Sequence, residues 1–433
     1  MSEHDRTGMD DVMREGMRRQ LTRRGFLKAA GGGAAAVSLG ALLAACGGGG
    51  SETAGGGATN LDPSKIFSQP AGDTVHFANW PLYIDKAKDD NGDIIYPSLQ
   101  NFTKDTGITV DYQDVIQDNA SFFGKLQPQL QAGDSTGWDI IVITNGEQFT
   151  ALVANDWVLP LDTTKRPNFD KYAADFARNP SYDPENKHSM PWQSGLTGIG
   201  VNHELINGAV TKIDDLANPN IVGQSSVGML KADMPDFVMI NLGIDPKTSG
   251  PAEWKAAAAW LQKQKDSGTV RQYYDQGYVD DLTAGNLSAT MAWSGDVMYY
   301  NIWGGYDNLE FIFPDGGALL WIDNMMIPAG AENPTGALEL MDYVYKPEIA
   351  TMITEWVLYM SPCAATRELI KKDAAKAEAN GDKGLATKLN ATADNEFLYP
   401  DEQLLSQVSF ARDLRTDEER EEYHSIFDPI SES

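Results

Sequence analysis

Two large aromatic residues follow the end of a short apolar run, in the stretch VHFANWPLYIDK at positions 75–86. Trp80 and Tyr83 lie three positions apart there, with a proline between them. Aromatic faces attract alkyl chains by dispersion, and they attract cations by about 0.5–2 kcal/mol, depending on how far the pair is desolvated. The two residues are therefore candidates for the wall of a binding site, and two aromatics alone do not distinguish an alkylammonium chain from a sugar.

Further aromatic and acidic residues stand where predicted strands or helices end. In an open α/β sheet, ligands bind beyond the carboxyl ends of the strands, so such positions tend to face a cleft. Each residue taken singly also fits an ordinary core or surface position, because the chain has 10 tryptophans to place. The candidates are Trp293 at the end of LSATMAW, Trp321 and Asp323 in ALLWID, and Tyr359 after TEWVL. A carboxylate such as Asp323 would bind an ammonium group through a charge-assisted hydrogen bond.

Alternating strand-like and helix-like segments would position these residues. DTVHFAN, GITVDYQDV and WDIIVIT predict short buried strands, and SLQNFTKDTG and EQFTALVAND have helical spacing. The alternation predicts an α/β fold with a mainly parallel sheet and helices on its faces. A second series runs from SGLTGIGVN to ALLWIDNMMIP, so we expect two lobes. The segments 334–357 and 367–391 are expected to be helical, with a turn at NGDKG.

The first 72 residues carry export and tethering signals. TRRGFLK resembles a twin-arginine export signal, and the apolar run after it ends in LAAC, which resembles a lipoprotein box. Cys46 would become the lipid-bearing first residue of the mature chain. Residues 1–45 are thus predicted to be a signal peptide, and residues 46–72 a lipidated cysteine with a flexible glycine-rich linker.

Composition limits the partners of the exported part. The chain carries 34 Lys and Arg against 62 Asp and Glu, a net charge of -28. Nucleic acid and anionic membrane surfaces would be repelled, whereas a cationic ligand would be attracted. An acidic surface also simply confers solubility. With Cys46 acylated, Cys363 is the only thiol left, so we expect no intramolecular disulfide.

Motifs for catalysis or metal binding are missing from the sequence. GxSxG, SxxK, GxxxxGK[ST], CxxC and HExxH do not occur, and the histidines do not have the spacing of a metal site. DDNGD at 89–93 departs from a calcium loop at its sixth and twelfth positions and predicts a solvated turn. We expect no catalytic residue, metal or cofactor. Carboxylate pairs for glycoside hydrolysis stay open as an alternative, because an acidic chain always offers such pairs.

Five segments resemble the spermidine/putrescine-binding proteins of polyamine ABC transporters. They are FANWPLYID, MPWQSGLTGIGVN, SATMAWSGD, GGALLWIDNMMIPAGAENPTGALELMDYVYKPEIA and YMSPCAATREL, in an order and spacing that agree from about residue 74 to residue 401. The resemblance implies a two-lobed, type II periplasmic-binding-protein fold that closes around a linear polyamine and delivers it to a permease, without catalytic activity. It divides the chain into lobe 1 (73–192), lobe 2 (193–322) and a return to lobe 1 with C-terminal helices spanning both lobes (323–433).

The resemblance also carries a set of ligand-binding residues. It assigns Trp80, Tyr83, Trp293, Trp321, Asp323 and Tyr359, and it adds an acidic pair after a strand, Asp233 and Asp236 in KADMPDF. An aspartate before a helix is usually an N-cap, so capping is an alternative of equal weight for this pair.

The sequence departs from the family pattern in three places. The family often has a serine and a tyrosine after the third strand, where this chain has Thr144-Asn145-Gly146, so one aromatic wall is expected to be missing. Residues 86–97 and 370–392 look like insertions. Either insertion could change which polyamine fits, or whether one does.

The sequence thus predicts the substrate-binding component of an ABC importer. It would be a monomer, lipid-anchored on the outer face of the cytoplasmic membrane, with a polyamine and permease subunits as partners. The alternatives are a receptor for a carbohydrate or another small solute and, from a different class, a surface glycosidase.

Overall fold

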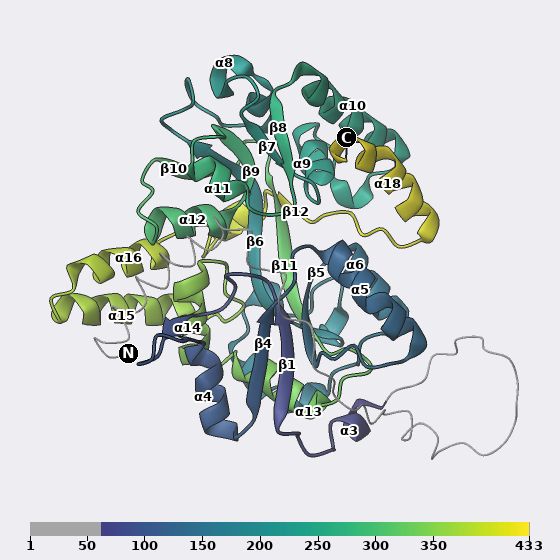
Figure 1. The fold of residues 1–433 in the computed structure, drawn as a ribbon, viewed down its shortest axis with the longest axis vertical. Coiled ribbons are helices and arrows are strands. Elements are labelled where there is room, and N and C mark those ends of the chain that lie inside the picture. The colour runs from purple at the N-terminus through teal and green to yellow at the C-terminus, as the bar shows by residue number, and fades with distance from the viewer. Residues whose placement is uncertain (1–61, 433) are drawn as a thin grey trace, which may run out of the picture.

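The computed structural model describes residues 62–432, and these form two lobes that lie end to end (Figure 1). Lobe 1, the lower half of the view, contains β1 (Thr74–Asn79), β4 (Thr109–Asp114) and β5 (Ile140–Thr144). Lobe 2, the upper half, contains β7 (Val227–Leu230), β8 (Val270–Tyr274) and β9 (Ala289–Trp293). The predicted alternation of strands and helices therefore holds in both halves.

Lobe 1 is built on a parallel core. β1 pairs in parallel with β4 and with β5, and Phe77 at its centre is fully buried. The ring of Phe77 meets the rings of Tyr112 and Trp192 edge to face. The main helices of this lobe are α4 (Pro97–Thr106), α5 (Asn119–Ala132), α6 (Glu147–Ala154) and α13 (Pro334–Tyr343). α4 begins with proline in its first turn, where no hydrogen bond is lost, and ends at Gly107 with a φ of 82°, which favours glycine.

Lobe 2 repeats the parallel arrangement. β7 pairs in parallel with both β8 and β9. Its helices are α9 (Met234–Asn241), α10 (Pro251–Ser267), α11 (Tyr278–Thr283) and α12 (Ser294–Ile302). β10 (Leu309–Ile312) pairs antiparallel with the end of the long strand β6 (Ser189–Asn202).

Two long antiparallel strands, β6 (Ser189–Asn202) and β11 (Ala318–Met326), join the lobes. They lie at the centre of the sheet order β4-β1-β5-β11-β6-β9-β7-β8, and every residue of β6 is buried. The prediction of a mainly parallel sheet is right within each lobe and wrong at the centre. The reason is that the chain enters lobe 2 along β6 and returns along β11, so the two strands must run in opposite directions.

The C-terminal part is helical, as predicted. It contains α14 (Pro347–Val357), the hairpin of α15 (Thr366–Ala379) and α16 (Lys383–Ala393), and α18 (Asp417–Ser431). The hairpin turns at Gly381, whose φ of 86° favours glycine, and Asp382 caps α16 through the backbone N–H of Leu385. Among residues 62–432, no helix combines the length and the apolarity that a membrane span requires.

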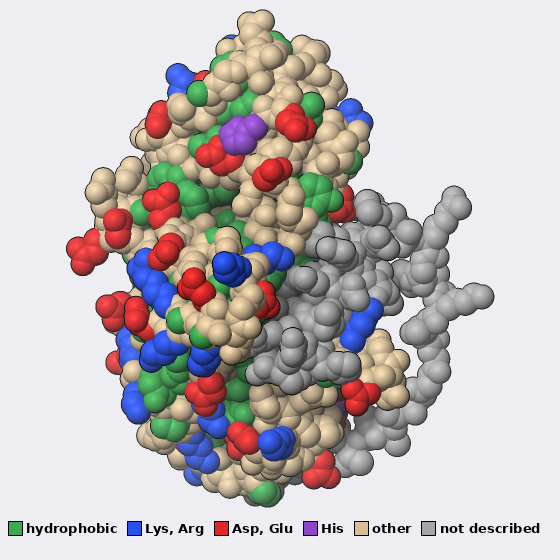
Figure 2. Space-filling model, turned by 90° about the vertical axis from the view of Figure 1, so that its left-hand side faces the viewer, with side chains coloured by type: hydrophobic (Ala, Val, Ile, Leu, Met, Phe, Trp, Pro, Cys, Tyr) green, Lys and Arg blue, Asp and Glu red, His purple; other side chains and the backbone are tan. Residues whose placement is uncertain are grey.

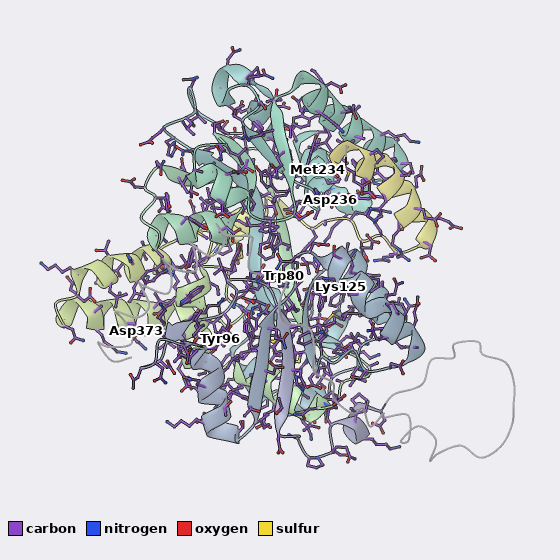
Figure 3. The ribbon with its side chains drawn as sticks, in the orientation of Figure 1. Trp80, Tyr96, Lys125, Met234, Asp236 and Asp373 are labelled. Atoms are coloured by element: carbon purple, nitrogen blue, oxygen red, sulfur yellow. The ribbon has the colours of Figure 1, made fainter. Side chains whose placement is uncertain are left out.

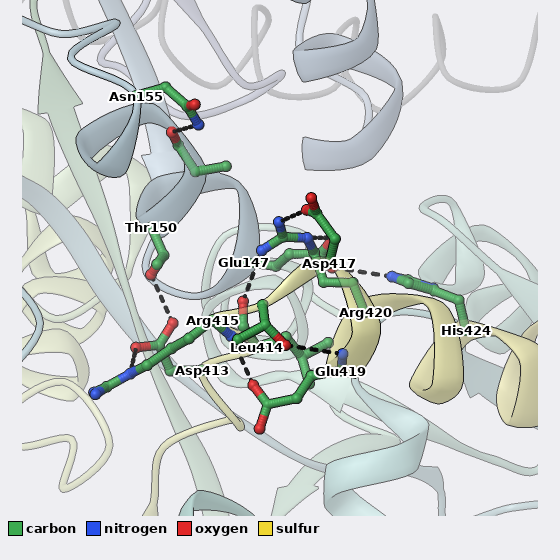
Figure 4. Close-up of polar contacts among 12 residues, drawn as sticks. Glu147, Thr150, Asn155, Asp413, Leu414, Arg415, Asp417, Glu419, Arg420 and His424 are labelled. Atoms are coloured by element: carbon green, nitrogen blue, oxygen red, sulfur yellow. Dashed lines mark hydrogen bonds and ion pairs between the residues drawn. The ribbon is translucent and has the colours of Figure 1, made fainter. Parts of the chain in front are cut away.

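A polar cluster connects α18, which packs against α10 of lobe 2, to α6 of lobe 1 (Figure 4). The carboxylate of Glu147 lies 3.0 Å from Nε2 of His424 and 3.9 Å from Nε of Arg420. The hydroxyl of Thr150 donates to Asp413 at 2.6 Å. The C-terminal segment is therefore a second connection between the lobes, besides β6 and β11.

The predicted flexible linker needs a correction at its end. Residues 1–61, with the predicted signal peptide and Cys46, lie outside the described part of the chain. Within 62–72, however, Asp62 caps the short helix α3 (Pro63–Ile66), and Phe67 is fully buried. Gly72 also donates to the side chain of Asn333 at 2.8 Å. The fold therefore begins before Asp73, because Phe67 contributes to the core.

The remaining elements are short. They are β2 (Ala87–Lys88), β3 (Ile94–Ile95), α7 (Pro167–Tyr172), α8 (Pro219–Val222), α17 (Glu402–Leu405), β12 (Val408–Ser409) and five 3-10 turns within the described residues. The tip of the β2–β3 hairpin is the DDNGD segment. Asp89 accepts hydrogen bonds there from the backbone N–H groups of Asn91 and Asp93, which confirms the predicted turn.

Acidic side chains are scattered over both lobes in the side view, whereas basic ones gather over the lower half (Figure 2). The negative net charge is thus not confined to one patch. The charge of a binding site must therefore be judged from the residues that line it.

Candidate ligand-binding site

A cavity of about 170 Å³ lies between the two lobes. Since each water molecule takes about 30 Å³ in the liquid, this volume has room for roughly half a dozen waters or a small elongated solute. Trp80, one of its lining residues, lies near the centre of the molecule, where the lobes meet (Figure 3). The lining comes from lobe 1 (Trp80, Pro81, Leu82, Tyr83, Gln117, Asp118, Asn119, Thr144), from lobe 2 (Ala232, Asp233, Asp275, Gln276, Gly277, Val279, Trp293, Asp296, Tyr300), and from Trp321, Asp323 and Tyr359.

The charge of the lining is entirely negative. Five aspartates line the cavity, and no lysine, arginine or histidine of the described chain does. Two of the five have other roles, because Asp118 caps α5 and Asp275 forms an ion pair with Lys231 at 3.0 Å. The remaining three are Asp323, Asp296 and Asp233.

Asp323 is buried on β11 and is held by hydroxyl groups from lobe 1. Tyr83 donates to one carboxylate oxygen at 2.7 Å, and Thr144 donates to the other at 2.6 Å. Burial raises the pKa of Asp323 to about 6, and the two hydroxyl donors oppose that rise. Asp233 also raises it, because a second negative charge faces the same cavity.

Asp296, in the first turn of α12, is bound by two phenols. The hydroxyl of Tyr359 donates to one oxygen at 2.7 Å, and that of Tyr278 donates to the other at 2.9 Å. Burial of the carboxyl raises the pKa of Asp296 above its usual range. Asp296 was not predicted as a site residue, although it lies within the segment SATMAWSGD that carried the family resemblance.

Asp233 precedes α9 but does not cap it through its side chain. Its carboxylate instead accepts hydrogen bonds from the hydroxyl of Thr197 at 2.6 Å and from Nε1 of Trp293 at 2.9 Å. Burial raises its pKa as well. The capping alternative is therefore wrong for Asp233, whose side chain lines the cavity.

Asp236, the second member of the predicted pair, is not among the cavity residues. It lies in the upper lobe close to the C-terminal segment (Figure 3), where the backbone N–H of Arg412 and the hydroxyl of Tyr423 both donate to it at 3.3 Å. Burial raises its pKa to about 7. The two carboxyls of the predicted pair thus have different roles. Asp233 lines the cavity, whereas Asp236 is hydrogen-bonded to the C-terminal segment that includes α18.

Four of the five aromatic candidates form one connected wall. The ring of Tyr359 lies 5.3 Å from that of Tyr83 and 5.3 Å from that of Trp321, both in edge-to-face geometry. Trp321 in turn meets Trp293 at 6.5 Å. Residues that are far apart in the sequence thus contribute neighbouring rings.

Two glycines make room for this wall. A Cβ atom at Gly195 would lie 2.5 Å from the ring of Trp321, and one at Gly295 would lie 2.5 Å from the ring of Tyr359. Such distances are too short for any side chain, so the two rings lie directly against the backbone of β6 and α12.

The two residues of the opening motif are fixed by the backbone around them. The indole N–H of Trp80 donates to the carbonyl of Val142 at 3.2 Å. The indole N–H of Trp192 donates to the carbonyl of Tyr83 at 3.1 Å. Trp80 therefore presents its ring to the cavity while the one donor of its side chain is used inside lobe 1.

Thr144 and Asn119 were not predicted as site residues from the sequence. Thr144 begins the segment Thr144-Asn145-Gly146, in which an aromatic wall was expected to be missing, and its hydroxyl donates to Asp323. No sequence signal marks Asn119, which lies 25 positions before Thr144 and hydrogen-bonds to it. Within residues 62–432, no group of three or more His, Cys, Asp or Glu side chains is arranged to hold a metal ion.

The fold and the site together define a class, a two-lobed receptor with a ligand cavity between its lobes. Residues 98–380 match the family model described as bacterial extracellular solute-binding protein, so the chain belongs to that family. The predicted two-lobed α/β fold is confirmed. The chain is accordingly a binding protein that acts outside the cytoplasm, not an enzyme, and the glycosidase alternative falls away.

Relatives with assigned ligands cover most of the chain. The spermidine/putrescine-binding periplasmic protein of Salmonella typhimurium is 25% identical over 343 residues, which are 79% of this chain and 87% of that protein. The putrescine-binding periplasmic protein PotF of Escherichia coli is 29% identical over 324 residues, with 69% and 80% covered. A solved structure, a putative spermidine/putrescine ABC transporter from Listeria monocytogenes, has a TM-score of 0.66 at 25% identity, with 83% and 99% covered.

Proposed function

We propose that this chain binds a polyamine of the putrescine or spermidine type between its lobes and delivers it to the permease of an ABC importer. One observation carries the proposal. Asp233, Asp296 and Asp323 line one cavity, their hydrogen bonds come from neutral hydroxyl and indole groups, and the lining contributed by residues 62–432 contains no basic side chain.

Electrostatics explain why such a cavity favours a polycation. Removing a carboxylate from water costs several kcal/mol unless an opposite charge or sufficient hydrogen bonds compensate it. Neutral donors compensate only part of that cost, as the raised pKa values of all three aspartates indicate. A ligand with two or more ammonium groups would supply the missing charge.

The aromatic wall suits the remainder of the same ligand. Methylene segments between ammonium groups gain dispersion contacts on the faces of Trp and Tyr, and the ammonium groups gain cation–π attraction. Trp80, Tyr83, Trp293, Trp321 and Tyr359 line the cavity beside the three aspartates. The names of the relatives, which are spermidine- and putrescine-binding proteins, support the same ligand class.

The position of the carboxylates supports closure around the ligand. Asp323 is held by Tyr83 and Thr144 of lobe 1, whereas Asp233 and Asp296 belong to lobe 2. A diammonium or triammonium ligand would therefore bridge the lobes and stabilise the closed form, which the permease then recognises. The division into 73–192, 193–322 and 323–433 remains our proposal for the two lobes.

Calorimetry on the chain from residue 47 onward tests the ligand class. We expect saturable binding of putrescine or spermidine that weakens several-fold when salt rises, because charge pairing is screened. At a fixed salt concentration, Asp323→Asn and Trp321→Ala should each weaken the binding of the polyamine. If a sugar binds with an affinity that does not depend on salt, and no polyamine gives a heat of binding, the result would instead support a carbohydrate receptor.

The lipid anchor, the twin-arginine route and the monomeric state complete the proposal, and they rest on the sequence alone. Incorporation of labelled fatty acid into the expressed full chain, lost in Cys46→Ser, tests the anchor. Light scattering of the chain from residue 47 onward tests the monomer. A Cys46→Ser chain that still carries the label would overturn the first of these predictions.

A further inference from the structure

Both oxygens of Asp323 meet hydroxyl groups, but the two hydroxyls differ in how firmly their protons are directed. The phenol of Tyr83 has Asp323 as its partner at 2.7 Å. The hydroxyl of Thr144 has one proton and two lone pairs, so it could either donate or accept. The direction of its hydrogen bond to Asp323 therefore depends on what else binds its oxygen.

Asn119 settles that direction. Its side-chain Nδ2 lies 2.8 Å from Oγ1 of Thr144, and its Oδ1 accepts from the backbone N–H of Thr144 at 3.2 Å. Because the carboxamide donates to the hydroxyl oxygen, the hydroxyl proton is directed to Asp323, whose oxygen is 2.6 Å away. The three side chains form a relay in which each donates to the next.

The relay is anchored on a long helix. Asn119 is the first residue of α5, and Asp118 caps that helix by accepting from the backbone N–H of Ser121 at 2.6 Å. Thr144 is the last residue of β5 and pairs in register with Asp323 on β11. The positions of all three groups are therefore set by regular elements.

We propose that Asn119 is a positioning residue of the cation site, which directs the Thr144 hydroxyl onto Asp323 and so keeps Asp323 in its carboxylate form. A carboxylate that accepts two O–H donors is stabilised as an anion, whereas a protonated carboxyl would repel an ammonium N–H. The inference deepens the proposed function and rests on it for the identity of the ligand.

The other groups around Asp323 make its charge sensitive to this relay. The negative charge of Asp233, from lobe 2, favours protonation, and Tyr83 is a neutral donor because burial raises its pKa well above the ordinary value. Tyr182, also kept neutral by a raised pKa, donates to the neighbouring Asn324. With the pKa of Asp323 already about 6, the loss of one donor would bring protonation close to neutral pH.

A titration of the ligand-free protein tests the relay directly. The side-chain carboxyl carbon of Asp323 would be followed by NMR and assigned by its disappearance in Asp323→Asn. Asn119→Ala and Thr144→Val should each raise its pKa by about one pH unit, the shift expected when a charged acceptor loses a hydrogen bond. The double variant should add nothing to Thr144→Val, because Asn119 acts through that hydroxyl.

Two further variants separate positioning from a structural role. Asn119→Asp keeps the shape and the acceptor for the backbone of Thr144, but it accepts the hydroxyl proton and adds a negative charge, so the pKa of Asp323 should rise further than in Asn119→Ala. Gln117→Ala removes another amide from the cavity lining and should leave the titration unchanged. Circular dichroism confirms that each variant is folded.

The outcomes distinguish this inference from the proposed function. An unchanged Asp323 titration in folded Asn119→Ala, or an equal shift in Gln117→Ala, overturns the relay. Putrescine affinity should be lost at a higher pH in Asn119→Ala than in the unmodified chain. If the unmodified chain binds no polyamine, the proposed function fails, whereas the titration without ligand still decides the role of Asn119.

Discussion

The hydroxyl oxygen of Tyr83 lies 2.7 Å from a carboxylate oxygen of Asp323, although 240 positions separate the two residues in the chain. Tyr83 follows the end of β1, and Asp323 lies on β11 as the chain returns from lobe 2. Their contact joins the segment with Trp80 and Tyr83 to the carboxylate to which we assign the preference for a cation over a sugar.

Removing this hydroxyl should weaken binding without disturbing the fold. Tyr83→Phe deletes the donor to Asp323 but keeps the ring that meets Tyr359 at 5.3 Å. We expect about a tenfold loss of polyamine affinity by calorimetry, which corresponds to one hydrogen bond to a charged group. Tyr96→Phe is the matched control, because Tyr96 lies beside α4 and not in the cavity (Figure 3). An equal loss in both variants would contradict the assignment.

Asp323 should cost the ligand-free protein stability. The folded-state pKa of about 6 lies above the ordinary value of 3.8, so the folded protein binds the proton more tightly than the unfolded chain. The penalty is absent below the unfolded pKa and complete above about pH 6, where it reaches roughly 2–3 kcal/mol. Asp323→Asn should therefore raise the free energy of unfolding at pH 7.5 more than at pH 4, while it weakens polyamine binding. A variant destabilised equally at both pH values would refute this prediction.

The same titration should govern the ligand. As the pH falls through about 6, Asp323 becomes protonated and loses the charge that attracts an ammonium group. Polyamine affinity measured from pH 8 to pH 5 should drop, and the drop should be smaller in Asp323→Asn. An affinity that is constant over this range would show that Asp323 does not bind the ligand as a carboxylate.

The glycines behind the aromatic wall should not tolerate a side chain. At Gly195 a Cβ atom would meet the ring of Trp321 at 2.5 Å, so Gly195→Ala must displace that ring. We expect a loss of about 1–3 kcal/mol in the free energy of unfolding, together with weaker polyamine binding. Gly124→Ala is the control, since Gly124 lies inside α5 and a Cβ atom there would have no neighbouring atom within 4 Å. That variant should gain roughly 0.5–1 kcal/mol; a stable, fully binding Gly195→Ala would contradict the packing argument.

The polar cluster between α6 and α18 should make the free energy of unfolding fall as the pH becomes alkaline. Glu147 and Asp428 raise the pKa of His424 to about 9, above the ordinary value of 6.5. This contribution is fully present below about pH 6.5 and is lost as the pH rises through about 9. Because the imidazole is 43% exposed, we expect only about 1 kcal/mol. Urea unfolding of Glu147→Gln at about pH 6 and about pH 10 measures it.

A matched control exists on the same helix. Glu422→Gln removes an ion pair with Lys255 that lies within lobe 2 and does not connect the lobes. It should leave the difference between the acidic and the alkaline measurement unchanged. If Glu147→Gln also leaves it unchanged, the cluster makes no measurable contribution.

The sequence predicted the local elements better than their arrangement. Apolar runs such as WDIIVIT identify β5, and helical spacing with a turn at NGDKG identifies α15 and α16. The antiparallel centre of the sheet was missed, because alternation of strands and helices does not reveal that β6 and β11 pass between lobes. The place of Phe67 in the core was hidden by the glycine-rich segment before it.

The site was predicted where a residue type and a strand end coincide. Seven of the eight proposed binding residues line one cavity. The exception is Asp236, whose carboxylate accepts hydrogen bonds from Arg412 and Tyr423 of the C-terminal segment. Asn119, Asp296 and Tyr278 were not predicted, because their roles depend on contacts between distant segments.

A crystal structure of the complex with spermidine tests the central claim most directly. We predict ammonium nitrogens within about 3 Å of the carboxylate of Asp323 and of at least one carboxylate in lobe 2, either Asp233 or Asp296, with methylene groups on the ring of Trp321. A spermidine molecule whose nitrogens lie away from all three aspartates, or a cavity that remains without ligand at saturating spermidine, would contradict it.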